Sequence, residues 1–331
     1  MKLYLIRHGE TVDNVAGLYA GVRNSALTNY GVEQAQRLGQ YFAKTQVHFT
    51  HIFSSPLTRA YETAEAVRKA QSSAKGGEDD LQIVKVPDLI EQDFGFYEGK
   101  PFYARSDPKR SGRDAHYERH KNDPGFVDIE SKESMGRRAD NFLNEHLLPL
   151  LKVAEAEDMT IAIVAHGMLL SSLWKKLLLR LPRKSLTIAP EIRATRDNLV
   201  LEHLGGWSNT GYLELALSKG KVSEAATVEV TESTGAAESD LQTLPTPVLP
   251  PMEDKVAGVA AEPSTTSPRE DAKENSADKP RNFEGWSTII LAIDSKQHLG
   301  GLKRQRGGIG RLAHDEGQKK LDGFFKKQRT G

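Results

Sequence analysis

The sequence predicts an α/β fold, a three-layer helix–sheet–helix arrangement around a mainly parallel β-sheet. Along residues 1–219, short apolar runs typical of buried strands alternate with longer segments whose apolar residues recur at helical spacing. Strands that alternate with helices are typical of layered α/β proteins. We therefore expect residues 1–219 to form one folded domain.

Taken in order, the strand candidates are short runs rich in branched apolar residues. They cover residues 3–6, 47–53, 81–86, 160–165, 199–204 and 212–217. The helix candidates carry apolar residues on one side, and the third of them is expected to bend at Pro149. They cover residues 31–44, 57–71, 135–156 and 168–180. Residues 100–133 are polar and irregular, which indicates an insertion or lid.

The composition changes after Ser218. Residues 221–280 contain no aromatic residue and carry 12 acidic and 5 basic residues, a net charge of −7. Such a segment cannot bury enough apolar surface to offset its ordering entropy, so residues 220–282 are predicted to be a disordered linker. Apolar residues return at Phe283, and residues 291–331 carry 10 basic and 4 acidic residues, a net charge of +6. We predict that residues 283–331 form a basic tail.

The residue types exclude several kinds of chemistry. With no cysteine among 331 residues, the chain has no disulfide, no thiolate catalysis and no Cys-ligated zinc. Its most apolar stretch, residues 161–179, is broken by His166, Lys175 and Lys176, so no membrane contact is expected. The first residues lack the apolar run of a secretion signal. We expect an intracellular protein, in the nucleus, the cytoplasm or both.

Charged and polar residues follow three of the predicted strands at their carboxyl ends. Arg7 and His8 follow the first strand, His166 follows a later one, and Arg59 stands in the first turn of a helix after another. The carboxyl ends of parallel strands meet at one edge of a sheet, where ligands collect. Two arginines and two histidines suit a tetrahedral dianion, because guanidinium groups are fork-shaped donors of constant charge. The sequence thus predicts a phosphate-binding pocket.

Four segments, in this order, resemble the histidine phosphatase superfamily, which includes the cofactor-dependent phosphoglycerate mutases. They are Arg7-His8-Gly9-Glu10-Thr11, Ser55-Pro56-Leu57-Thr58-Arg59-Ala60, Leu89-Ile90-Glu91-Gln92-Asp93-Phe94-Gly95-Phe96-Tyr97-Glu98-Gly99 and Ala165-His166-Gly167. The resemblance covers residues 1–219 and implies a catalytic domain of that family. It implies phosphoryl transfer with no cofactor and no metal, and no metal-ligand spacing is visible in the sequence.

By this resemblance, His8 is the catalytic nucleophile and becomes a phosphohistidine. Arg7 and Arg59 bind the phosphoryl oxygens, and His166 acts beside them as a further catalytic residue. Phosphoryl transfer depends on positioning and on charge stabilisation around three equatorial oxygens, and fixed arginines supply both. An imidazole nucleophile divides the hydrolysis into two easier steps.

The same resemblance gives roles to two further residues. Glu91 is expected to protonate the leaving alcohol and then to activate water, and Asn14 to bind phosphate through its amide. Asn14 has the alternative of capping a turn, and Glu98 is expected to be structural. The chain departs from the family where Asn24 replaces an Asp and Ala26 a Pro, which affects contacts on the substrate side.

A short motif near the carboxyl terminus points to a partner. Residues 318–325 resemble the PCNA-interacting peptide through Gln318, Leu321 and the pair Phe324 and Phe325. A single helical turn would gather the three apolar residues into a plug for a sliding clamp. The alternative is a tail that packs on the protein itself or touches a membrane. The basic cluster at 303–308 is a weak indication of nuclear import or nucleic-acid binding.

These observations predict a metal-independent phosphomonoesterase acting through His8 and recruited by its tail to a nuclear sliding clamp. Its substrate would be a small-molecule or protein-borne phosphomonoester. Two alternatives remain open. The phosphohistidine could pass its phosphoryl group to another hydroxyl, as in a phosphoglycerate-type mutase, or the domain could be a non-catalytic phosphate-binding scaffold acting through the tail.

Overall fold

The computed structural model describes residues 1–75, 81–102, 117–118, 120–153, 158–196, 199–219, 283–305 and 308–314. Its strands are β1 (Lys2–Arg7), β2 (His51–Ser54), β3 (Ile83–Lys85), β4 (Thr160–Ala165), β5 (Leu186–Ile188), β6 (Tyr212–Lys219) and β7 (Trp286–Ser295). Its helices are α1 (Val12–Ala16), α2 (Asn29–Lys44), α3 (Thr58–Lys75), α5 (Lys132–Phe142), α6 (Leu148–Val153), α7 (Gly167–Arg180) and α8 (Pro190–Arg193). Short 3-10 turns lie at Pro87–Leu89, Gly95–Tyr97, Arg183–Ser185, Gln297–Leu299 and Ile309–Arg311.

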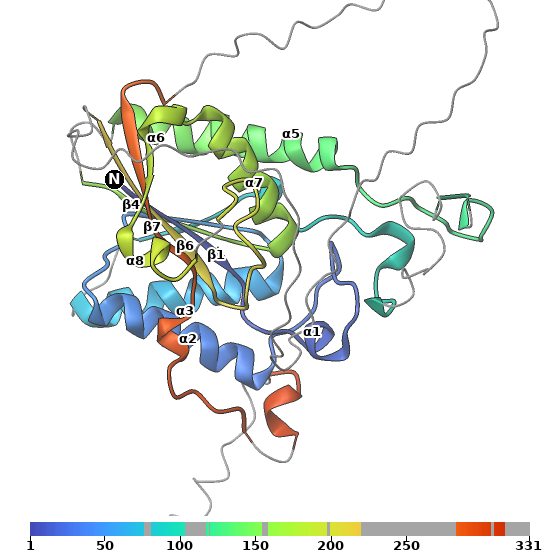
Figure 1. The fold of residues 1–331 in the computed structure, drawn as a ribbon. Helices are drawn as coiled ribbons and strands as arrows, with labels where there is room; N and C mark the ends of the chain where they lie inside the picture. The colour runs from blue at the N-terminus through green and yellow to red at the C-terminus, as the bar shows by residue number, and fades with distance from the viewer. Residues whose placement is uncertain are drawn as a thin grey trace, which may run out of the picture.

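The described strands form one seven-stranded sheet in the order β3-β2-β4-β1-β6-β7-β5. The pairs along β3-β2-β4-β1 and the pair β7-β5 are parallel, whereas β6 runs antiparallel to both of its neighbours. Helices α2 and α3 cover one face, and α5, α6 and α7 cover the other (Figure 1). The predicted α/β fold with a mainly parallel sheet is confirmed. Among the described helices, none has the length and apolar character needed to cross a membrane.

Strand β1 is buried on both faces, and its side chains alternate between two cores. Leu3 and Leu5 pack in the core beneath α5 and α7, and Tyr4 and Ile6 pack in the core beneath α2 and α3. All four side chains are at most 1% exposed. A central parallel strand has this continuous apolar character because helices cover both of its faces. The double packing fixes the carboxyl end of β1, where the predicted nucleophile follows.

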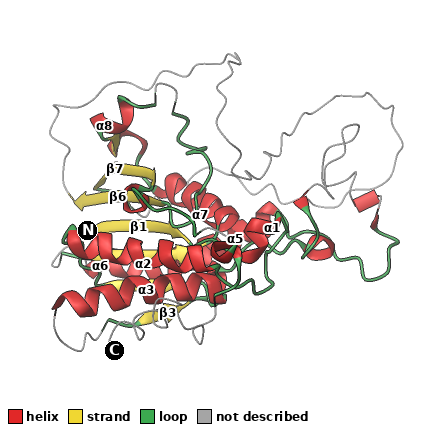
Figure 2. Cartoon of the chain, turned by 90° about the horizontal axis from the view of Figure 1, so that it is seen from below, coloured by secondary structure: helices red, strands yellow, loops and turns green. Residues whose placement is uncertain are grey.

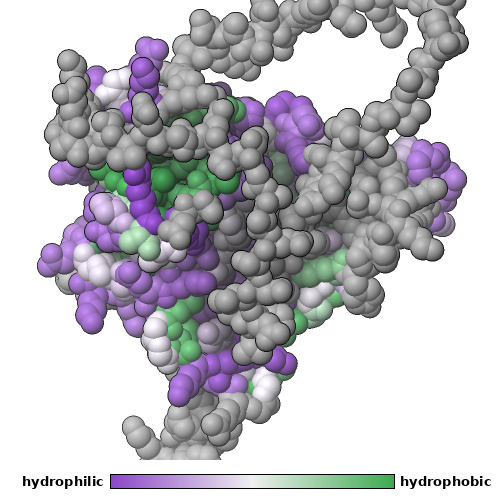
Figure 3. All heavy atoms as spheres, in the orientation of Figure 1, coloured by the Kyte–Doolittle hydropathy of each residue, from purple (hydrophilic) through white to green (hydrophobic). Residues whose placement is uncertain are grey.

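Helix α2 shows why amphipathic spacing predicts a helix here. Its side chains Ala35, Leu38 and Phe42 are buried, at helical spacing, while most of its outer residues are polar. The outer surface over α2 and α3 is mostly hydrophilic (Figure 3). The two helices lie side by side across the sheet (Figure 2).

Gly39 allows the close approach of α2 to α3. A Cβ atom at this position would lie 2.6 Å from the Ala66 carbonyl oxygen and 2.9 Å from Ala70 Cβ. We expect Gly39→Ala to lower the free energy of unfolding by about 1–3 kcal/mol through overpacking, despite the higher helix propensity of alanine. Urea unfolding measures this. The matched control is Gly206→Ala, whose new methyl group would meet nothing within 4 Å; an equal effect of both variants would contradict the packing argument.

The structure differs from the expected helix at 135–156. A π-helical turn at Leu143–Leu147 separates α5 from α6, one turn before Pro149. Proline has no N–H, and its ring collides with the carbonyl four residues earlier, so the helix widens just before it. Residues 154–157 of the expected helix lie outside the described residues.

The expected strand at 199–204 is absent from the described chain. Val200 and His203 instead close a tight turn through an isolated bridge, and the Leu201 carbonyl accepts a hydrogen bond from Trp174 Nε1 at 2.6 Å. The prediction was wrong because the sheet position beyond β6 is taken by β7, so a strand at 199–204 has no free edge beside β6.

Part of the expected tail belongs to the sheet. Strand β7 lies between β6 and β5, with Ile290 fully buried and Trp286 6% exposed. The chain then crosses α2, where Gln297 Oε1 accepts a hydrogen bond from the Tyr41 hydroxyl at 2.5 Å and Gly300 accepts one from Arg37. The predicted linker at 220–282 lies outside the described residues, as does the motif at 318–325.

Arg304 belongs to the basic cluster at 303–308 and is engaged within the fold. Its guanidinium makes a two-pronged ion pair with the Glu10 carboxylate and lies 4.4 Å from the ring centre of Tyr30. This arginine therefore anchors the carboxyl-terminal segment beside the start of α2.

Candidate active site

The two histidines that the sequence predicted to converge lie together. Strands β1 and β4 are parallel neighbours in register, with Arg7 opposite Ala165, so His8 and His166 leave the sheet at the same edge. Their ring centres are 5.1 Å apart, and the His8 N–H donates to the Ala165 carbonyl at 3.0 Å. His8 is 4% exposed and His166 is fully buried.

The His8 ring is held in a defined tautomer. Its Nδ1 lies 2.7 Å from the Gly9 carbonyl oxygen, and because a carbonyl only accepts hydrogen bonds, Nδ1 carries the proton. The unshared electron pair is therefore on Nε2. Burial, followed by the positive charges of Arg59 and Arg7, holds the pKa of His8 well below its usual value. The ring is neutral at physiological pH, which is the state that a nucleophile needs.

Gly9 fixes the backbone next to this ring. A Cβ atom there would lie 2.6 Å from the Gly31 carbonyl oxygen at the start of α2. The Gly9 N–H donates to the Thr63 hydroxyl of α3 at 3.0 Å. The turn after β1 is thus packed against both helices, and a larger residue would displace the His8 backbone.

His166 is held by side chains from a neighbouring strand end. Arg59 Nε donates to its Nδ1 at 3.2 Å, so the proton is on Nε2, which donates to the Ser55 hydroxyl at 2.8 Å. Burial first, and then the charge of Arg59, lowers the pKa of His166 well below its usual value. His166 is therefore a neutral hydrogen-bond donor at the bottom of the site.

Arg59 has a structural role that the sequence did not predict, because it binds backbone groups as well as His166. Besides His166, its guanidinium donates to the backbone carbonyls of Ala20, Gly21 and Arg23 at 2.8–3.1 Å. Burial lowers the pKa of Arg59 to about 10, an effect opposed by the nearby carboxylates of Glu91 and Glu98. Arg59 thus remains charged at neutral pH and links the loop after α1 to His166.

Arg7 has an unused donor in the site. Its NH1 donates to the Trp207 carbonyl, whereas its Nε is buried and has no hydrogen-bond partner among the described residues. A Cβ atom at Gly167 would lie 3.9 Å from this Nε, so the donor faces the start of α7. Buried donors in native proteins are almost always paired, and an unpaired one beside two histidines indicates an anion site.

Glu91 caps helix α7 from another part of the chain. Its carboxylate accepts hydrogen bonds from the N–H groups of Met168 at 3.1 Å, Leu169 at 2.9 Å and Gln92 at 3.0 Å. These donors satisfy the first turn of the helix, where the macrodipole favours a negative charge. Glu91 is 7% exposed and close enough to Arg7 and Arg59 to stabilise their charged forms.

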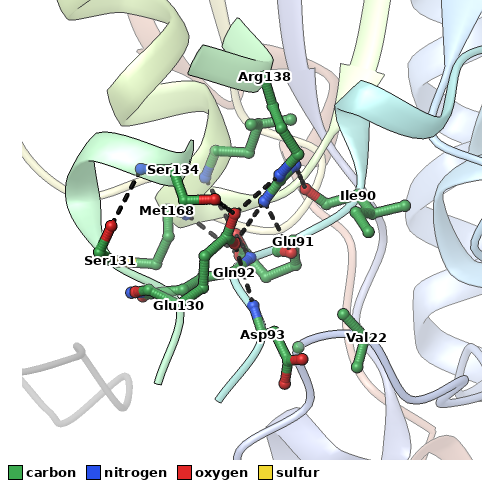
Figure 4. A network of polar contacts seen from close by, with 12 residues as sticks. Val22, Ile90, Glu91, Gln92, Asp93, Glu130, Ser131, Ser134, Arg138 and Met168 are labelled. Carbon is green, nitrogen blue, oxygen red and sulfur yellow. Dashed lines mark hydrogen bonds and ion pairs between the residues drawn. The ribbon is translucent and has the colours of Figure 1, made fainter. Parts of the chain in front are cut away.

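Arg138 holds the Glu91 segment from the side of α5 (Figure 4). It donates to the backbone carbonyls of Asp88 and Ile90 at 2.9 Å each and to that of Glu91 at 3.3 Å. Its remaining donors bind the Glu130 carboxylate at 2.6 and 2.9 Å. This network fixes the backbone on which Glu91 stands.

Asn14 caps a helix, which is the alternative to phosphate binding that the sequence left open. It forms a capping box with Thr11 at the start of α1, and its Oδ1 accepts hydrogen bonds from the Thr11 N–H at 3.2 Å and from Asn209 Nδ2 at 3.1 Å. Glu98 is structural, as predicted, because it accepts the N–H groups of Gly21, Val22 and Phe94.

Asn24, which stands where the family has an Asp, also has a capping role. Its side-chain oxygen accepts the Thr58 N–H at 3.1 Å, at the start of α3. An aspartate would accept the same bond, so the substitution preserves this contact.

The sequence did not reveal several residues that build the site. Ser55 stood within a recognised motif without a role, and Arg138 carries no local signal because its targets are backbone carbonyls distant along the chain. The loop Trp207–Gly211 lies outside every motif of the sequence. In the described residues, no group of three or more His, Asp and Glu side chains could hold a metal ion.

Acidification is expected to destabilise the protein through buried neutral histidines. His298 behaves like His8 and His166: burial lowers its pKa to about 4. Its Nε2 bonds the Thr210 hydroxyl at 2.8 Å, whereas its buried Nδ1 has no acceptor for a second proton among the described residues. The unfolded chain binds protons from about pH 6.5 downwards. Stability is therefore full above that pH and falls as the pH drops toward 4.

Urea unfolding tests this linkage. Between about pH 7.5 and about pH 5.5 we expect each of the three histidines to remove about 1 kcal/mol of unfolding free energy. His298→Gln should shrink the wild-type difference by about that amount, because the variant has one titrating group fewer. An unchanged difference would contradict a neutral buried His298.

The fold and the site together define an α/β protein in which two neutral histidines and two arginines lie together at the carboxyl edge of the sheet. Residues 3–196 match the family model described as histidine phosphatase superfamily (branch 1), and the chain belongs to this family. The predicted family is thus confirmed. The match ends before the loop Trp207–Gly211 and before β7.

Similar proteins carry phosphatase names. The chain is 39% identical over 98 residues to "Probable fructose-2,6-bisphosphatase TIGAR A" of Danio rerio, covering 29% of this chain and 36% of that protein. It is 37% identical over 103 residues to "Putative phosphoserine phosphatase 2" of Hydrogenobacter thermophilus, covering 31% and 46%. It is 29% identical over 177 residues to "Probable phosphatase C1620.13" of Schizosaccharomyces pombe, covering 53% and 56%. The chain thus spans between a third and just over half of these relatives.

Some solved structures also align with the chain. A mycobacterial glucosyl-3-phosphoglycerate phosphatase aligns with a TM-score of 0.47 at 24% identity, covering 65% of this chain and 89% of that one. A phosphoglycerate mutase of Bacillus anthracis aligns with a TM-score of 0.46 at 23% identity, covering 65% and 87%.

Proposed function

We propose that the protein is a phosphomonoesterase that works through a phosphohistidine at His8. One observation carries this proposal. His8 is neutral, has its electron pair on Nε2, and lies beside His166 and the unused Nε donor of Arg7. Family membership supports the class of reaction.

In the first step, His8 Nε2 attacks the phosphorus atom, and the ester oxygen leaves with the bonding electrons. Arg7 and Arg59 supply positive charge next to the equatorial oxygens, and His166 donates from Nε2 once a phosphoryl oxygen replaces Ser55 as its acceptor. Fixed donors in a site shielded from water stabilise developing charge more strongly than solvent does. Asn14 adds its amide N–H groups from the side of α1.

In the second step, water attacks the phosphohistidine, and the N–P bond breaks. Glu91 accepts the proton of this water: its carboxylate has about four lone-pair positions, of which three accept N–H groups, so one is left for the proton. The resulting carboxyl group then protonates the leaving alcohol of the next substrate. One carboxyl group thus carries the proton for both steps, and no metal ion takes part.

Trapping the intermediate tests this mechanism. Rapid quenching of the wild-type protein with an aryl phosphate should give a phosphoprotein that is labile in acid and stable in alkali, as expected for a phosphorus–nitrogen bond. Phosphate release should be unchanged by excess chelator. Loss of activity in chelator would contradict the metal-free reaction, and an alkali-labile phosphoprotein would contradict a histidine nucleophile.

The substrate is proposed as a class, a small-molecule or protein-borne phosphomonoester. The names of the relatives include a bisphosphatase and a phosphoserine phosphatase, which supports monoester chemistry and no single compound. A mutase is the alternative, in which the phosphohistidine passes its phosphoryl group to another hydroxyl. Product analysis with an added acceptor alcohol separates the two, because only hydrolysis releases one phosphate per ester cleaved.

We further propose that the tail recruits the protein to a sliding clamp in the nucleus. The proposal rests on the sequence of residues 318–325, with Gln318, Leu321, Phe324 and Phe325 as the contacts, and these residues lie outside the described ones. Calorimetry with a peptide spanning residues 317–330 should show binding, and Phe324→Ala/Phe325→Ala should abolish it. If the wild-type peptide gives no binding heat with the clamp, the proposal of clamp recruitment is wrong. If the protein binds the clamp but hydrolyses no phosphomonoester, the result would favour the alternative of a non-catalytic phosphate-binding scaffold.

A further inference from the structure

A loop outside the family motifs holds the nucleophile in place. In the loop Trp207–Gly211, the Thr210 N–H donates to the carbonyls of Arg7 and His8 at 3.1 Å each, and Asn209 Nδ2 donates to the His8 carbonyl at 3.2 Å. The Arg7 N–H in turn donates to the Gly211 carbonyl at 3.1 Å. The backbone of the nucleophile is therefore fixed by this loop as well as by β4.

The loop also orients side chains of the site. The Trp207 carbonyl accepts the NH1 donor of Arg7, which leaves Arg7 Nε free to face an anion. Asn209 Nδ2 donates to Asn14 Oδ1 at 3.1 Å. A shift of this loop would thus move His8, Arg7 and Asn14 together.

The loop contains a strained residue, so contacts with the rest of the protein must maintain its conformation. Thr210 has a φ of 57°, a left-handed conformation that is rare and unfavourable for a branched residue. Such a conformation persists only where the surroundings impose it. The strain identifies the contacts around Thr210 as the ones that keep the loop in position.

The carboxyl-terminal segment supplies further contacts to this loop, in addition to those that Thr210 makes with Arg7 and His8. Asp294, near the end of β7, accepts the Ser208 N–H at 2.8 Å and the Ser208 hydroxyl at 2.7 Å. A Cβ atom at Gly211 would lie 2.1 Å from Asp294 Oδ1, so the carboxylate fits only against a glycine. His298 Nε2 bonds the Thr210 hydroxyl at 2.8 Å.

We propose that Asp294 is a positioning residue for His8 and Arg7, acting through the loop Trp207–Gly211. The inference rests on the proposed function, because it assigns a role in the same phosphate site. It predicts that the site is incomplete without β7, although the four segments that resemble the family all lie within 1–219. Asp294 and the loop both lie beyond the residues that match the family, so the family pattern does not supply this role.

The test compares three variants of the full chain. Asp294→Ala removes both acceptors for Ser208. Asp294→Asn keeps a carbonyl acceptor for the Ser208 N–H and offers its amide N–H to the Ser208 hydroxyl. Ile290→Val is the matched control, because Ile290 is buried on the same strand and pairs with Leu215, away from the loop. Thermal unfolding, kcat and KM for an aryl phosphate, and calorimetric affinity for inorganic phosphate are measured for each.

We expect Asp294→Ala to lower kcat by about 10- to 100-fold, because small displacements of reacting groups have effects of that size. It should also bind phosphate about tenfold more weakly, through the displaced Arg7. Asp294→Asn should stay within about fivefold of the wild type, the effect of about one hydrogen bond. Ile290→Val should lower the unfolding temperature with kcat and phosphate affinity unchanged.

Two results would overturn the inference. One is an Asp294→Ala variant with wild-type kcat and wild-type phosphate affinity. The other is an Ile290→Val variant that loses as much kcat as Asp294→Ala, since the effect would then be general destabilisation of β7. If the wild-type protein releases no phosphate from the ester, the proposed function fails and the phosphate affinities decide: weaker binding by Asp294→Ala upholds the positioning role, and equal binding overturns it.

Discussion

Replacing His8 by alanine is expected to lower kcat/KM for an aryl phosphate by about 10⁴- to 10⁶-fold, the range seen when a covalent nucleophile is removed. Both buried histidines have a defined tautomer and a lowered pKa, but their free electron pairs differ: that of His8 is on Nε2, whereas Nδ1 of His166 accepts a hydrogen bond from Arg59 Nε. Steady-state kinetics measures the loss, and phosphoprotein trapping should give no labelled protein.

The matched control for this variant is His48→Ala. His48 is an exposed histidine outside the site, so its replacement should leave both kcat and the trapped intermediate unchanged. An unfolding temperature near that of the wild type would show that His8→Ala is folded. Wild-type rates in folded His8→Ala would remove His8 from the mechanism.

Replacing Glu91 by glutamine is expected to lower kcat by about 10²- to 10⁴-fold, the usual contribution of a general acid or base. The loss should depend on the leaving group. An ester of an acidic phenol leaves without a proton, so its phosphohistidine should still form rapidly and then accumulate, because no base activates water. An alkyl ester needs the proton, so its first step should be slow as well. Quenched-flow measurement with both esters separates the two steps.

The Glu91 variant also disturbs structure, and the control must account for this. In glutamine an NH₂ group replaces one carboxylate oxygen and would face the N–H of Met168 or Leu169, so one hydrogen bond at the start of α7 is lost. We expect this to lower the free energy of unfolding by about 1–3 kcal/mol. Glu98→Gln breaks a comparable set of contacts to backbone N–H groups away from the proposed proton path. If Glu98→Gln shows the same dependence on leaving group, the chemical role of Glu91 fails.

The centre of the site was predictable because it depends on local sequence and one topological rule. A buried parallel strand followed by Arg7 and His8, and another followed by His166, must end at the same sheet edge when the strands are neighbours. The apolar runs were strong enough to identify both strands. The neutral state of both rings follows from that placement, because burial next to arginines lowers their pKa values.

The outer parts of the site were not predictable from local patterns. Arg138 and Asp294 act on backbone groups, which have no sequence signature, and each reaches them across a long stretch of chain. The sequence shows that apolar residues return at Phe283, but nothing in these residues indicates that they form a strand that pairs with β6. Strand pairing between distant segments depends on which sheet edge is free, and that is known only when the whole sheet is known.

The insertion of β7 inside the sheet has a consequence for how the chain folds during synthesis. Within the described sheet, β5 pairs only with β7, and β7 follows β5 by almost a hundred residues of sequence. Strand β5 must therefore wait, with its hydrogen-bonding edge open, until the ribosome has delivered residues 286–295. This pairing joins residues far apart in the sequence and so raises the contact order, and a chain cut after β6 would leave the edges of β5 and β6 unpaired and open to other molecules.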